Sequence, residues 1–373
     1  MSNKIKIFNV VGTRPNFIKI APLIQEMDRY PELISHFLIH TGQHYDKQMS
    51  REIFGDLAIP TPDIHLGIRS DSSNEGIVRI MMACEKLLID KRPDLVLVVG
   101  DVNSTLAAAL AAAKFNIPIA HVEAGLRSFN WAMPEELNRI ITDRFSQFLF
   151  TTEKQANNNL FREGIARERI FFVGNVMVDA LTRHYKKSKK SDILRRLKIS
   201  KENFALLTFH RSENVDQEER LLEFAEIVDV IQKKIKVVFP IHPRTEKQIK
   251  KFNLQKKFRK MKNVILTEPL GYLDFLCLEG GARVVLTDSG GIQEETTVLN
   301  IPCLTLRNET ERPITVSQGT NTIVGLDKAK ISRAFKKISV NRQEKIKMPE
   351  LWDGKTAQRI IKILLNNKDK FFS

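Results

Sequence analysis

The sequence predicts an α/β fold with two Rossmann-like, doubly wound domains that face a central cleft. Three observations support this prediction. The chain has 373 residues, which is more than one hydrophobic core usually serves. Its 42% hydrophobic and 28% charged residues are typical of a globular α/β protein. Short apolar runs alternate with helix-like segments, and this pattern starts again after a basic, polar stretch at residues 185–201.

Apolar and β-branched runs indicate the strands. They cover residues 5–11, 36–42, 95–101, 117–124 and 148–153 in the first half of the chain, and residues 205–210, 237–242, 264–269, 284–288 and 303–306 in the second. Helix-like segments separate the runs, so each half predicts a parallel sheet with helices on both faces.

The formal net charge of +15 raises the question of a nucleic-acid partner. The basic stretches at residues 186–198 and 250–262 carry Leu and Phe at helical spacing, which is typical of amphipathic helices with solvated lysines. No nucleic-acid-binding motif accompanies them. We therefore expect no nucleic-acid partner, whereas a small anionic ligand is consistent with the charge.

Other sequence signals indicate a cytoplasmic protein without metal or cofactor. The three cysteines, Cys84, Cys277 and Cys303, lie in apolar segments and are expected to be buried, reduced thiols. No secretion signal and no apolar run long enough for membrane insertion is present. Neither an H-E-x-x-H motif nor a paired C-x-x-C motif occurs, so metal catalysis is not expected.

Polar residues follow the predicted strands at the point where each strand ends. In the first half, Arg14 comes after the first apolar run, and Asp101 and Glu123 lie at the ends of later runs. In the second half, His210 and Asp288 also lie at the ends of runs. Ligands of open parallel sheets bind outside the carboxyl ends of the strands. We therefore expect these residues to line the cleft between the two domains.

The segment LTDSGGIQEE predicts a diphosphate site. Ser289, Gly290 and Gly291 stand between a strand and a helix, where backbone N–H groups and the helix N-terminus favour phosphate. Glu295 lies in the first turns of that helix, and its carboxylate could accept hydrogen bonds from two ribose hydroxyls. A plain turn capped by Ser289, and structural charge compensation by Glu295, are the alternatives.

Cations are expected on both sides of such a diphosphate. Arg14 and Lys19 lie in GTRPNFIK after the first strand, and Arg312 lies in ETERPITV of the second half. Fixed cations would bind the diphosphate and stabilise its charge when it departs as a leaving group. Ordinary surface positions are the alternative reading of Arg14 and Lys19.

Carboxylates indicate acid and base chemistry in the same cleft. Asp101 and Glu123 stand at strand ends, and Glu135 follows Pro134 at the start of a predicted helix. Carboxylates that cluster raise one another's pKa and can exchange protons near neutrality, with His210 in addition. The structural alternatives are Asp101 as the N-cap of a helix over residues 102–114, and Glu135 or Glu136 as first-turn charge.

These motifs resemble those of the non-hydrolysing UDP-N-acetylglucosamine 2-epimerases. The similar segments are GTRPNFIK, TGQHYD, GD at Asp101, HVEAGLRS, PEELNR, VGNVMVDAL, FHRSEN, LTDSGGIQEE and TERP, and they span nearly the whole chain. The resemblance implies the glycosyltransferase-B architecture, with a C-terminal helix that crosses back to the first domain. The expected domains are residues 1–170 with 353–373, and residues 171–352.

The resemblance also implies a role for each matching residue. Asp101, Glu123, Glu135 and His210 would act on the sugar, and Arg14, Lys19, Ser289, Gly290, Gly291, Glu295 and Arg312 would hold UDP, with Phe275 near the uracil. In the family reaction, UDP leaves carbon 1 while carbon 2 loses a proton, and both return to a bound glycal so that carbon 2 is inverted. Inversion needs proton transfer on both faces, and the sequence assigns no carboxylate to a face.

Two departures from the family pattern bear on regulation and substrate. Members activated by a second UDP-sugar commonly have a QHR-type sequence where this chain has Gln43-His44-Tyr45; a regulatory or second-sugar pocket would use Gln43, His44 and His242. Residues 129–133, FNWAM, also differ, which is consistent with a deoxy or diacetamido sugar. A hydrolysing 2-epimerase and a UDP-sugar glycosyltransferase are the alternatives. The resemblance further implies a homodimer that serves polysaccharide biosynthesis.

Overall fold

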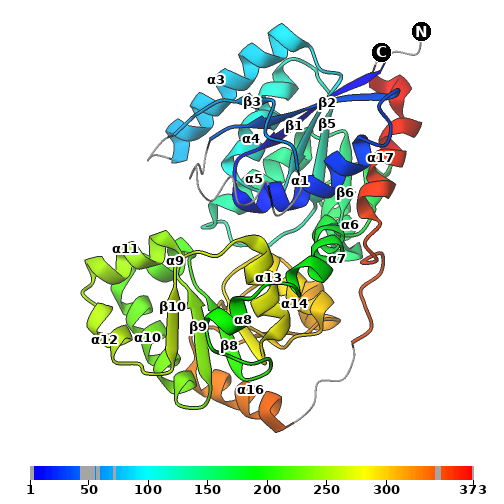
Figure 1. Cartoon of the computed structure of the whole chain (residues 1–373). Helices are drawn as coiled ribbons and strands as arrows, with labels where there is room; N and C mark the ends of the chain where they lie inside the picture. Colours follow the sequence, from blue (N-terminus) through cyan, green and yellow to red (C-terminus); the bar gives the residue numbers. More distant parts are fainter. Residues whose placement is uncertain (1–3, 43–54, 56–58, 70–72, 341–345, 372–373) are drawn as a thin grey trace. The chain divides into compact units, whose positions relative to one another are not determined.

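The computed structural model describes residues 4–42, 55, 59–69, 73–340 and 346–371. The chain forms two compact units. The first contains Met1–Thr182 and is completed by Glu350–Ser373, and the second contains Arg183–Pro349. The first unit is therefore discontinuous in sequence, and both ends of the chain belong to it (Figure 1).

The first unit is built on a parallel sheet. Its strands are β1 (Ile5–Val11), β2 (Ile34–His40), β3 (Ile64–His65), β4 (Leu95–Val99), β5 (Ile119–Ala124), β6 (Phe148–Thr151) and β7 (Ile170–Phe172). They lie in the order β3-β2-β1-β4-β5-β6-β7, and neighbouring strands are parallel. The chain proceeds outward from β1 on one side and from β4 on the other, so the topological switch point lies between β1 and β4.

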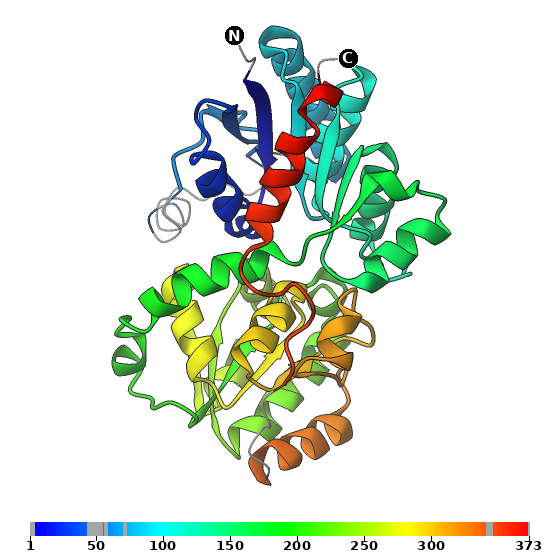
Figure 2. The ribbon, with the colours of Figure 1, turned by 90° about the vertical axis from the view of Figure 1, so that its right-hand side faces the viewer.

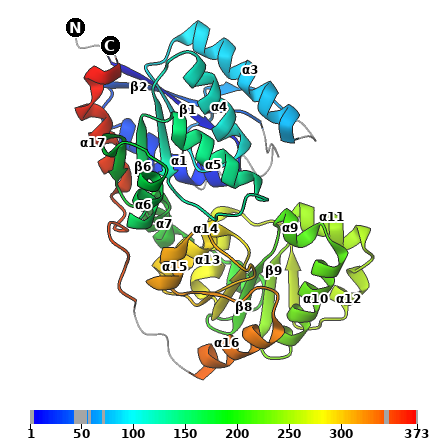
Figure 3. The same ribbon diagram turned by 180° about the vertical axis from the view of Figure 1, so that it is seen from behind.

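Helices cover both faces of this sheet. They are α1 (Arg14–Met27), α3 (Ser73–Lys91), α4 (Asn103–Lys114), α5 (Pro134–Phe145), α6 (Lys154–Arg162), α7 (Val176–Ser188), which crosses the unit boundary, and α17 (Thr356–Asn366). α3 and α4 share an apolar core with the sheet, and α5 lies beside α4 (Figure 3). α1 and α17 lie side by side on the other face (Figure 2). Because both faces are covered, β4 is apolar throughout.

The C-terminal segment is anchored to the first unit by hydrogen bonds from distant residues. The Trp352 Nε1 group donates to the Thr152 carbonyl at 3.1 Å. The buried Asp179 carboxylate of α7 accepts from the backbone N–H groups of Thr356 at 3.1 Å and Ala357 at 2.8 Å. These N–H groups belong to the first turn of α17 and have no partner within that helix. Asp179 therefore caps α17 from another element.

The second unit repeats the same architecture. Its strands are β8 (Phe204–Thr208), β9 (Lys236–Pro240), β10 (Val264–Thr267), β11 (Val284–Thr287), β12 (Cys303–Thr305) and β13 (Asn321–Ile323). Their order is β10-β9-β8-β11-β12-β13, and neighbouring strands are parallel. The switch point lies between β8 and β11.

Two apolar cores lie on the two faces of the second sheet. The helices are α8 (Ile193–Arg196), α9 (Ser212–Val215), α10 (Glu218–Gln232), α11 (Pro243–Lys251), α12 (Gln255–Arg259), α13 (Tyr272–Gly281), α14 (Gly290–Leu299), α15 (Pro313–Ser317) and α16 (Lys328–Val340). α10, α11, α12 and α16 contribute to one core. α8, α13 and α14 contribute to the other, on the face where α14 begins directly after β11.

These two parallel sheets, each with helices on both faces, confirm the predicted α/β fold class. Every strand that the sequence indicated is present, with shifted ends; β2, for example, covers Ile34–His40 where residues 36–42 were expected. The sequence did not indicate β3, β7 and β13, because two or three residues are too few for a periodic pattern. The three cysteines are buried and free, as expected.

The capping of α17 leads to a stability prediction. Asp179→Ala leaves two buried N–H groups without an acceptor, so we expect the free energy of unfolding to fall by about 1–3 kcal/mol. Urea unfolding followed by circular dichroism measures this change. Asp90→Ala, on the exposed end of α3, is the matched control and should stay within about 0.5 kcal/mol of the wild type. Equal effects of the two substitutions would refute the cap.

Candidate functional site

The predicted site residues of each unit gather at the carboxyl edge of its sheet. In the first unit Arg14 follows β1, Asp101 follows β4, and Glu123 lies near the end of β5. In the second unit His210 follows β8 and Ser289 follows β11. In both sheets these strands flank or adjoin the topological switch point, the place where open parallel sheets bind ligands.

Glu123 lies on a bulge at the end of β5. The register with β6 shifts between Val122 and Ala124. Glu123 itself has a φ of +73°, a left-handed conformation that costs energy for any residue other than glycine. Its side chain is buried and forms an ion pair with Lys19 of α1, which is also buried. Bulges re-aim side chains and are frequent beside active sites, so this strained backbone is consistent with a functional role for Glu123.

Gly100, between β4 and Asp101, makes room for this ion pair. Its φ is +70°, and a Cβ atom there would lie 3.2 Å from Glu123 Oε2 and 3.3 Å from Lys19 Nζ. Asn16 of α1 holds the same turn, because its Nδ2 group donates to the Val99 carbonyl at 2.8 Å. A side chain at residue 100 would therefore displace the buried charges.

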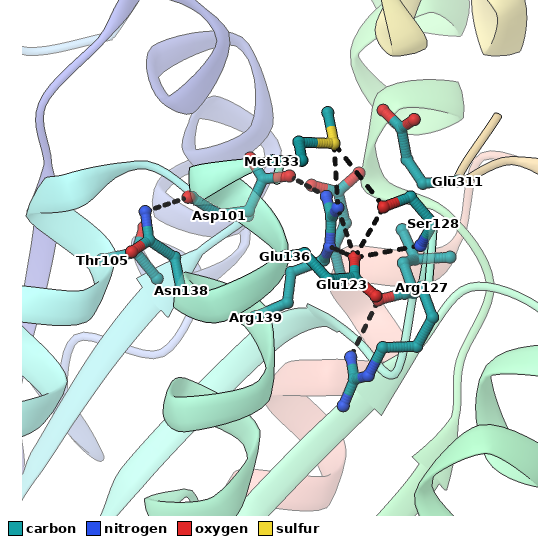
Figure 4. Close-up of polar contacts among 12 residues, drawn as sticks. Asp101, Thr105, Glu123, Arg127, Ser128, Met133, Glu136, Asn138, Arg139 and Glu311 are labelled. Carbon is teal, nitrogen blue, oxygen red and sulfur yellow. Dashed lines mark hydrogen bonds and ion pairs between the residues drawn. The ribbon is translucent and has the colours of Figure 1, made fainter. Parts of the chain in front are cut away.

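Asp101 faces a buried arginine of α5 (Figure 4). Arg139 forms ion pairs with Asp101 and, at 2.7 Å, with Glu136. Val102, and not Asp101, is the N-cap residue of α4, so the alternative reading of Asp101 as a helix cap is wrong. Asp101 and Glu123 each lie beside a cation.

The two glutamates at the start of α5 have different surroundings. Glu136 is buried and accepts hydrogen bonds from the backbone N–H groups of Ser128 and Phe129, both at 2.9 Å. Burial favours the neutral acid, but these bonds and Arg139 outweigh it and lower the pKa of Glu136. Glu135 is half-buried in the first turn of α5. Glu136 therefore has the structural role, which leaves Glu135 as the candidate for chemistry.

A buried histidine fixes the strand ends in the first unit. His121 Nε2 lies 2.8 Å from the Gly100 carbonyl, and Nδ1 lies 2.6 Å from the Asp143 carboxylate. Asp143 also accepts from the Gly125 N–H at 3.0 Å and pairs with Arg127 at 2.8 Å. Burial opposes ionisation of Asp143, but His121 and Arg127 outweigh burial and lower the pKa of this carboxyl.

These supporting residues were not predicted from the sequence. His121 and Arg127 belong to HVEAGLRS, and Arg139 belongs to PEELNR, so both segments contain polar residues in otherwise apolar surroundings. That signal could have indicated buried ion pairs. Asp143 stands in the last turn of α5 and has no comparable local signal.

In the second unit a buried carboxylate holds His210. Asp288, fully buried after β11, lies 3.0 Å from His210 Nδ1. It also accepts from the N–H groups of His210 and Arg211 at 2.9 Å, and from Asn214 Nδ2 at 3.1 Å. Burial would raise the pKa of Asp288, but these four donors outweigh it and keep the pKa far below its usual value. His210 is one-third exposed and is oriented by this ionised partner. The His242 ring lies 5.3 Å from the His210 ring.

The glycine turn after Asp288 forms the N-terminus of α14. Ser289 is the N-cap residue of α14, but its side chain makes no capping hydrogen bond, which contradicts the reading of this turn as a simple Ser cap. A Cβ atom on Gly290 would lie 2.6 Å from Glu311 Oε1, so the buried Glu311 side chain would have to shift to admit it. Gly291 is the next residue of the helix. This geometry is suited to a phosphate group.

Arg312, Glu295 and Phe275 lie on elements around the same turn. Arg312 is buried and pairs with Glu294 of α14 at 2.7 Å. Glu295, also buried, accepts a hydrogen bond from the Tyr272 hydroxyl at 3.1 Å. Phe275 is half-buried on α13, which packs against α14.

The remaining predicted positions are less informative. Arg14 is the half-buried first residue of α1. Gln43 and His44 lie outside the described residues, so of the expected regulatory set only His242 is described. In the described part of the chain, no cluster of three or more His, Cys, Asp or Glu side chains could hold a metal ion. Within the same residues, no helix has the length and apolar character needed to cross a membrane.

The fold and these strand-end residues define a Rossmann-like α/β protein of the glycosyltransferase-B type. Residues 25–365 match the family described as UDP-N-acetylglucosamine 2-epimerase. The chain therefore belongs to the UDP-N-acetylglucosamine 2-epimerase family.

Individual relatives agree with this membership. The UDP-N-acetylglucosamine 2-epimerase of Methanocaldococcus jannaschii is 43% identical over 98% of this chain and 100% of its own length. The crystal structure of the M. jannaschii UDP-GlcNAc 2-epimerase in complex with UDP-GlcNAc and UDP has a TM-score of 0.92 at 42% identity, covering 97% of this chain and 100% of that one. The UDP-2,3-diacetamido-2,3-dideoxy-D-glucuronate 2-epimerase of Pseudomonas aeruginosa is 40% identical over 86% of this chain and 88% of its own length.

The close approach at Gly100 can be tested against another glycine. Gly164 has a φ of +76° but no heavy atom within 4 Å of its Cβ position, so Gly164→Ala introduces backbone strain alone and should cost about 1–2 kcal/mol. Gly100→Ala adds crowding of buried charges, so we expect a further loss of about 1–3 kcal/mol. Urea unfolding of both variants measures the difference. Equal losses would show that Gly100 has only a conformational role.

Proposed function

We propose that the protein interconverts UDP-N-acetylglucosamine and UDP-N-acetylmannosamine by eliminating and re-adding UDP, without hydrolysis. The observation that carries the proposal is the similarity over nearly the whole chain to relatives named UDP-N-acetylglucosamine 2-epimerase. The strained Glu123 and the glycine turn at Ser289 supply independent chemical support.

The chemistry requires that the leaving group departs before or together with the proton. The hydrogen on carbon 2 has no neighbouring carbonyl to acidify it. Breaking the bond between carbon 1 and the UDP oxygen gives an oxocarbenium-like carbon 1, and the proton on carbon 2 then becomes far more acidic. The helix N-terminus at Ser289, with Arg14 and Arg312, stabilises the negative charge on departing UDP.

Carboxylates complete the reaction in both directions. One carboxylate takes the proton from carbon 2, and the electron pair of that bond forms the double bond between carbons 1 and 2 of a bound glycal. A second acid then protonates carbon 2 from the opposite face while a UDP oxygen attacks carbon 1. Asp101, Glu123 and Glu135 are the candidates for these two roles. Lys19 fixes Glu123 through their buried ion pair, and Arg139 fixes Asp101.

A second candidate for the sugar substrate follows from one relative and from one exposed segment. The P. aeruginosa relative carries a name that refers to a diacetamido glucuronate substrate. Phe129 and Trp131, in the segment that differs from the family form, are strongly exposed, and Phe129 has a φ of +60°. A UDP-2,3-diacetamido sugar is therefore the second substrate to assay.

An isotope experiment tests the proposed reaction. The protein is incubated with UDP-N-acetylglucosamine in deuterated water, and carbon 2 is followed by NMR. We expect a mixture of intact gluco and manno nucleotide sugars that carry deuterium at carbon 2. Free sugar with UDP would indicate the hydrolysing reaction, and transfer only in the presence of an acceptor would indicate a glycosyltransferase. If UDP-N-acetylglucosamine is not turned over but a UDP-2,3-diacetamido sugar is, the second candidate is the substrate.

Two carboxylate variants test the assigned chemistry. Asp101→Asn and Glu123→Gln each remove an acid or base while preserving shape, so we expect turnover to fall by about 100-fold or more with UDP binding retained. Calorimetric UDP titration and the NMR assay separate the two effects. Glu163→Gln, at the ion pair with Arg127, is the control and should keep its turnover. Loss of folding in both site variants would instead favour a structural role for these carboxylates.

A further inference from the structure

The second unit contains a buried carboxylate that the proposed reaction does not use. Glu279, in α13, has no exposed surface. Among the described residues, no N–H or O–H group donates a hydrogen bond to either of its oxygens. An isolated ionised carboxylate in such surroundings carries a large desolvation cost. Glu279 therefore needs either a proton or a partner.

The nearest partner is another carboxylate. Glu295 of the adjacent helix α14 interacts with Glu279 through charge and through a side-chain hydrogen bond. Burial, and then Glu295, raise the pKa of Glu279 well above its usual value. Two carboxylates can share a hydrogen bond only when one of them carries a proton, and two buried neighbours do not both ionise.

The surroundings decide which member of the pair carries the proton. Glu295 accepts a hydrogen bond from the Tyr272 hydroxyl, and this bond stabilises its ionised form. No described residue provides Glu279 with a donor of this kind. The proton therefore resides on Glu279, which becomes a donor to Glu295.

We propose that Glu279 is a positioning residue for ribose recognition: its protonated carboxyl group donates a hydrogen bond to Glu295 and holds that carboxylate ionised and oriented toward the ribose hydroxyls. The inference rests on the proposed function and on the expectation from the sequence that Glu295 binds the ribose of UDP. An ionised acceptor with a fixed orientation distinguishes ribose from deoxyribose, because loss of a hydroxyl leaves a buried charge without its donor. Glu279 thus determines nucleotide specificity without touching the nucleotide.

Three other titratable groups near the pair are neutral near neutral pH. Burial raises the pKa of the Cys303 thiol of β12 to about 12. Burial also raises the pKa of Tyr185 in α7, and Cys277 and Glu279 add to that shift. His184 lies edge-on to Tyr272, and burial, followed by the nearby charges of Lys187 and Arg183, lowers its pKa to about 4.

Nucleotide titrations of the full-length protein test the proposal. UDP and 2′-deoxy-UDP are titrated calorimetrically into the wild type, Glu279→Gln and Glu279→Leu. Because a hydrogen bond to a charged group is lost, Glu279→Leu should weaken UDP binding about tenfold or more and affect 2′-deoxy-UDP much less. Glu279→Gln keeps a neutral donor and should retain the preference for UDP.

A pH series gives an independent measure. Both ligands carry the same diphosphate, so the effect of its ionisation on binding cancels in the ratio of the two affinities. In the wild type, the preference for UDP should decline as the pH rises above neutral, because Glu279 loses its proton and becomes a second negative charge beside Glu295. In Glu279→Gln the preference should not change with pH. A pH-independent preference in the wild type would overturn the proposal.

The controls separate this inference from the proposed function. Glu295→Gln should abolish the preference for UDP; if the preference persists, the ribose role of Glu295 itself is wrong. If Glu295→Gln behaves as expected but Glu279→Leu weakens both nucleotides equally, Glu279 has only a packing role and the inference fails. If Glu279→Leu does not fold, two other results would overturn the inference. One is loss of the preference for UDP in Glu279→Gln, and the other is a preference in the wild type that does not change with pH. Thermal unfolding of each variant identifies folding defects.

Discussion

The buried ion pair between Lys19 and Glu123 is the constraint around which the first unit is organised. Two charges removed from water are tolerated only with close, well-oriented partners. The bulge in β5 turns Glu123 toward Lys19, and the bare backbone of Gly100 leaves the space. Asn16 ties the same helix to the end of β4. Three elements that are distant in sequence thus meet at one point because a single pair of charges has to be satisfied.

Both units stabilise their strand ends with a buried, ionised aspartate. Asp143 gathers His121, Arg127 and the Gly125 N–H in the first unit, while Asp288 gathers His210 and two backbone N–H groups in the second. A low-dielectric surrounding strengthens each of these bonds, provided that every donor has its acceptor. The loops that present the candidate catalytic groups are therefore held by hydrogen bonds and ion pairs of buried charges.

The sequence predicts the sheets better than the site. Strands that are covered on both faces, such as β4, are continuous apolar runs and can be recognised directly. The pairing of charges could not be predicted in the same way. Glu123 and Lys19 are separated by 104 residues, and only the folded chain shows that each carboxylate at the strand ends has a cation beside it. Glu279 lies in a segment that reads as an ordinary apolar helix, so its burial beside Glu295 gives no signal in the sequence.

The discontinuity of the first unit determines the order in which the chain can fold during synthesis. The ribosome completes all of Arg183–Pro349 before it adds α17, the helix that lies along α1 and is capped by Asp179. Domains generally fold as they emerge from the ribosome, so the second unit can fold while the first unit still exposes the apolar surface of α1. A nascent chain thus holds a finished second unit and a first unit whose sheet is complete but whose helix α17 is still missing, and that interval is when molecular chaperones have most to protect.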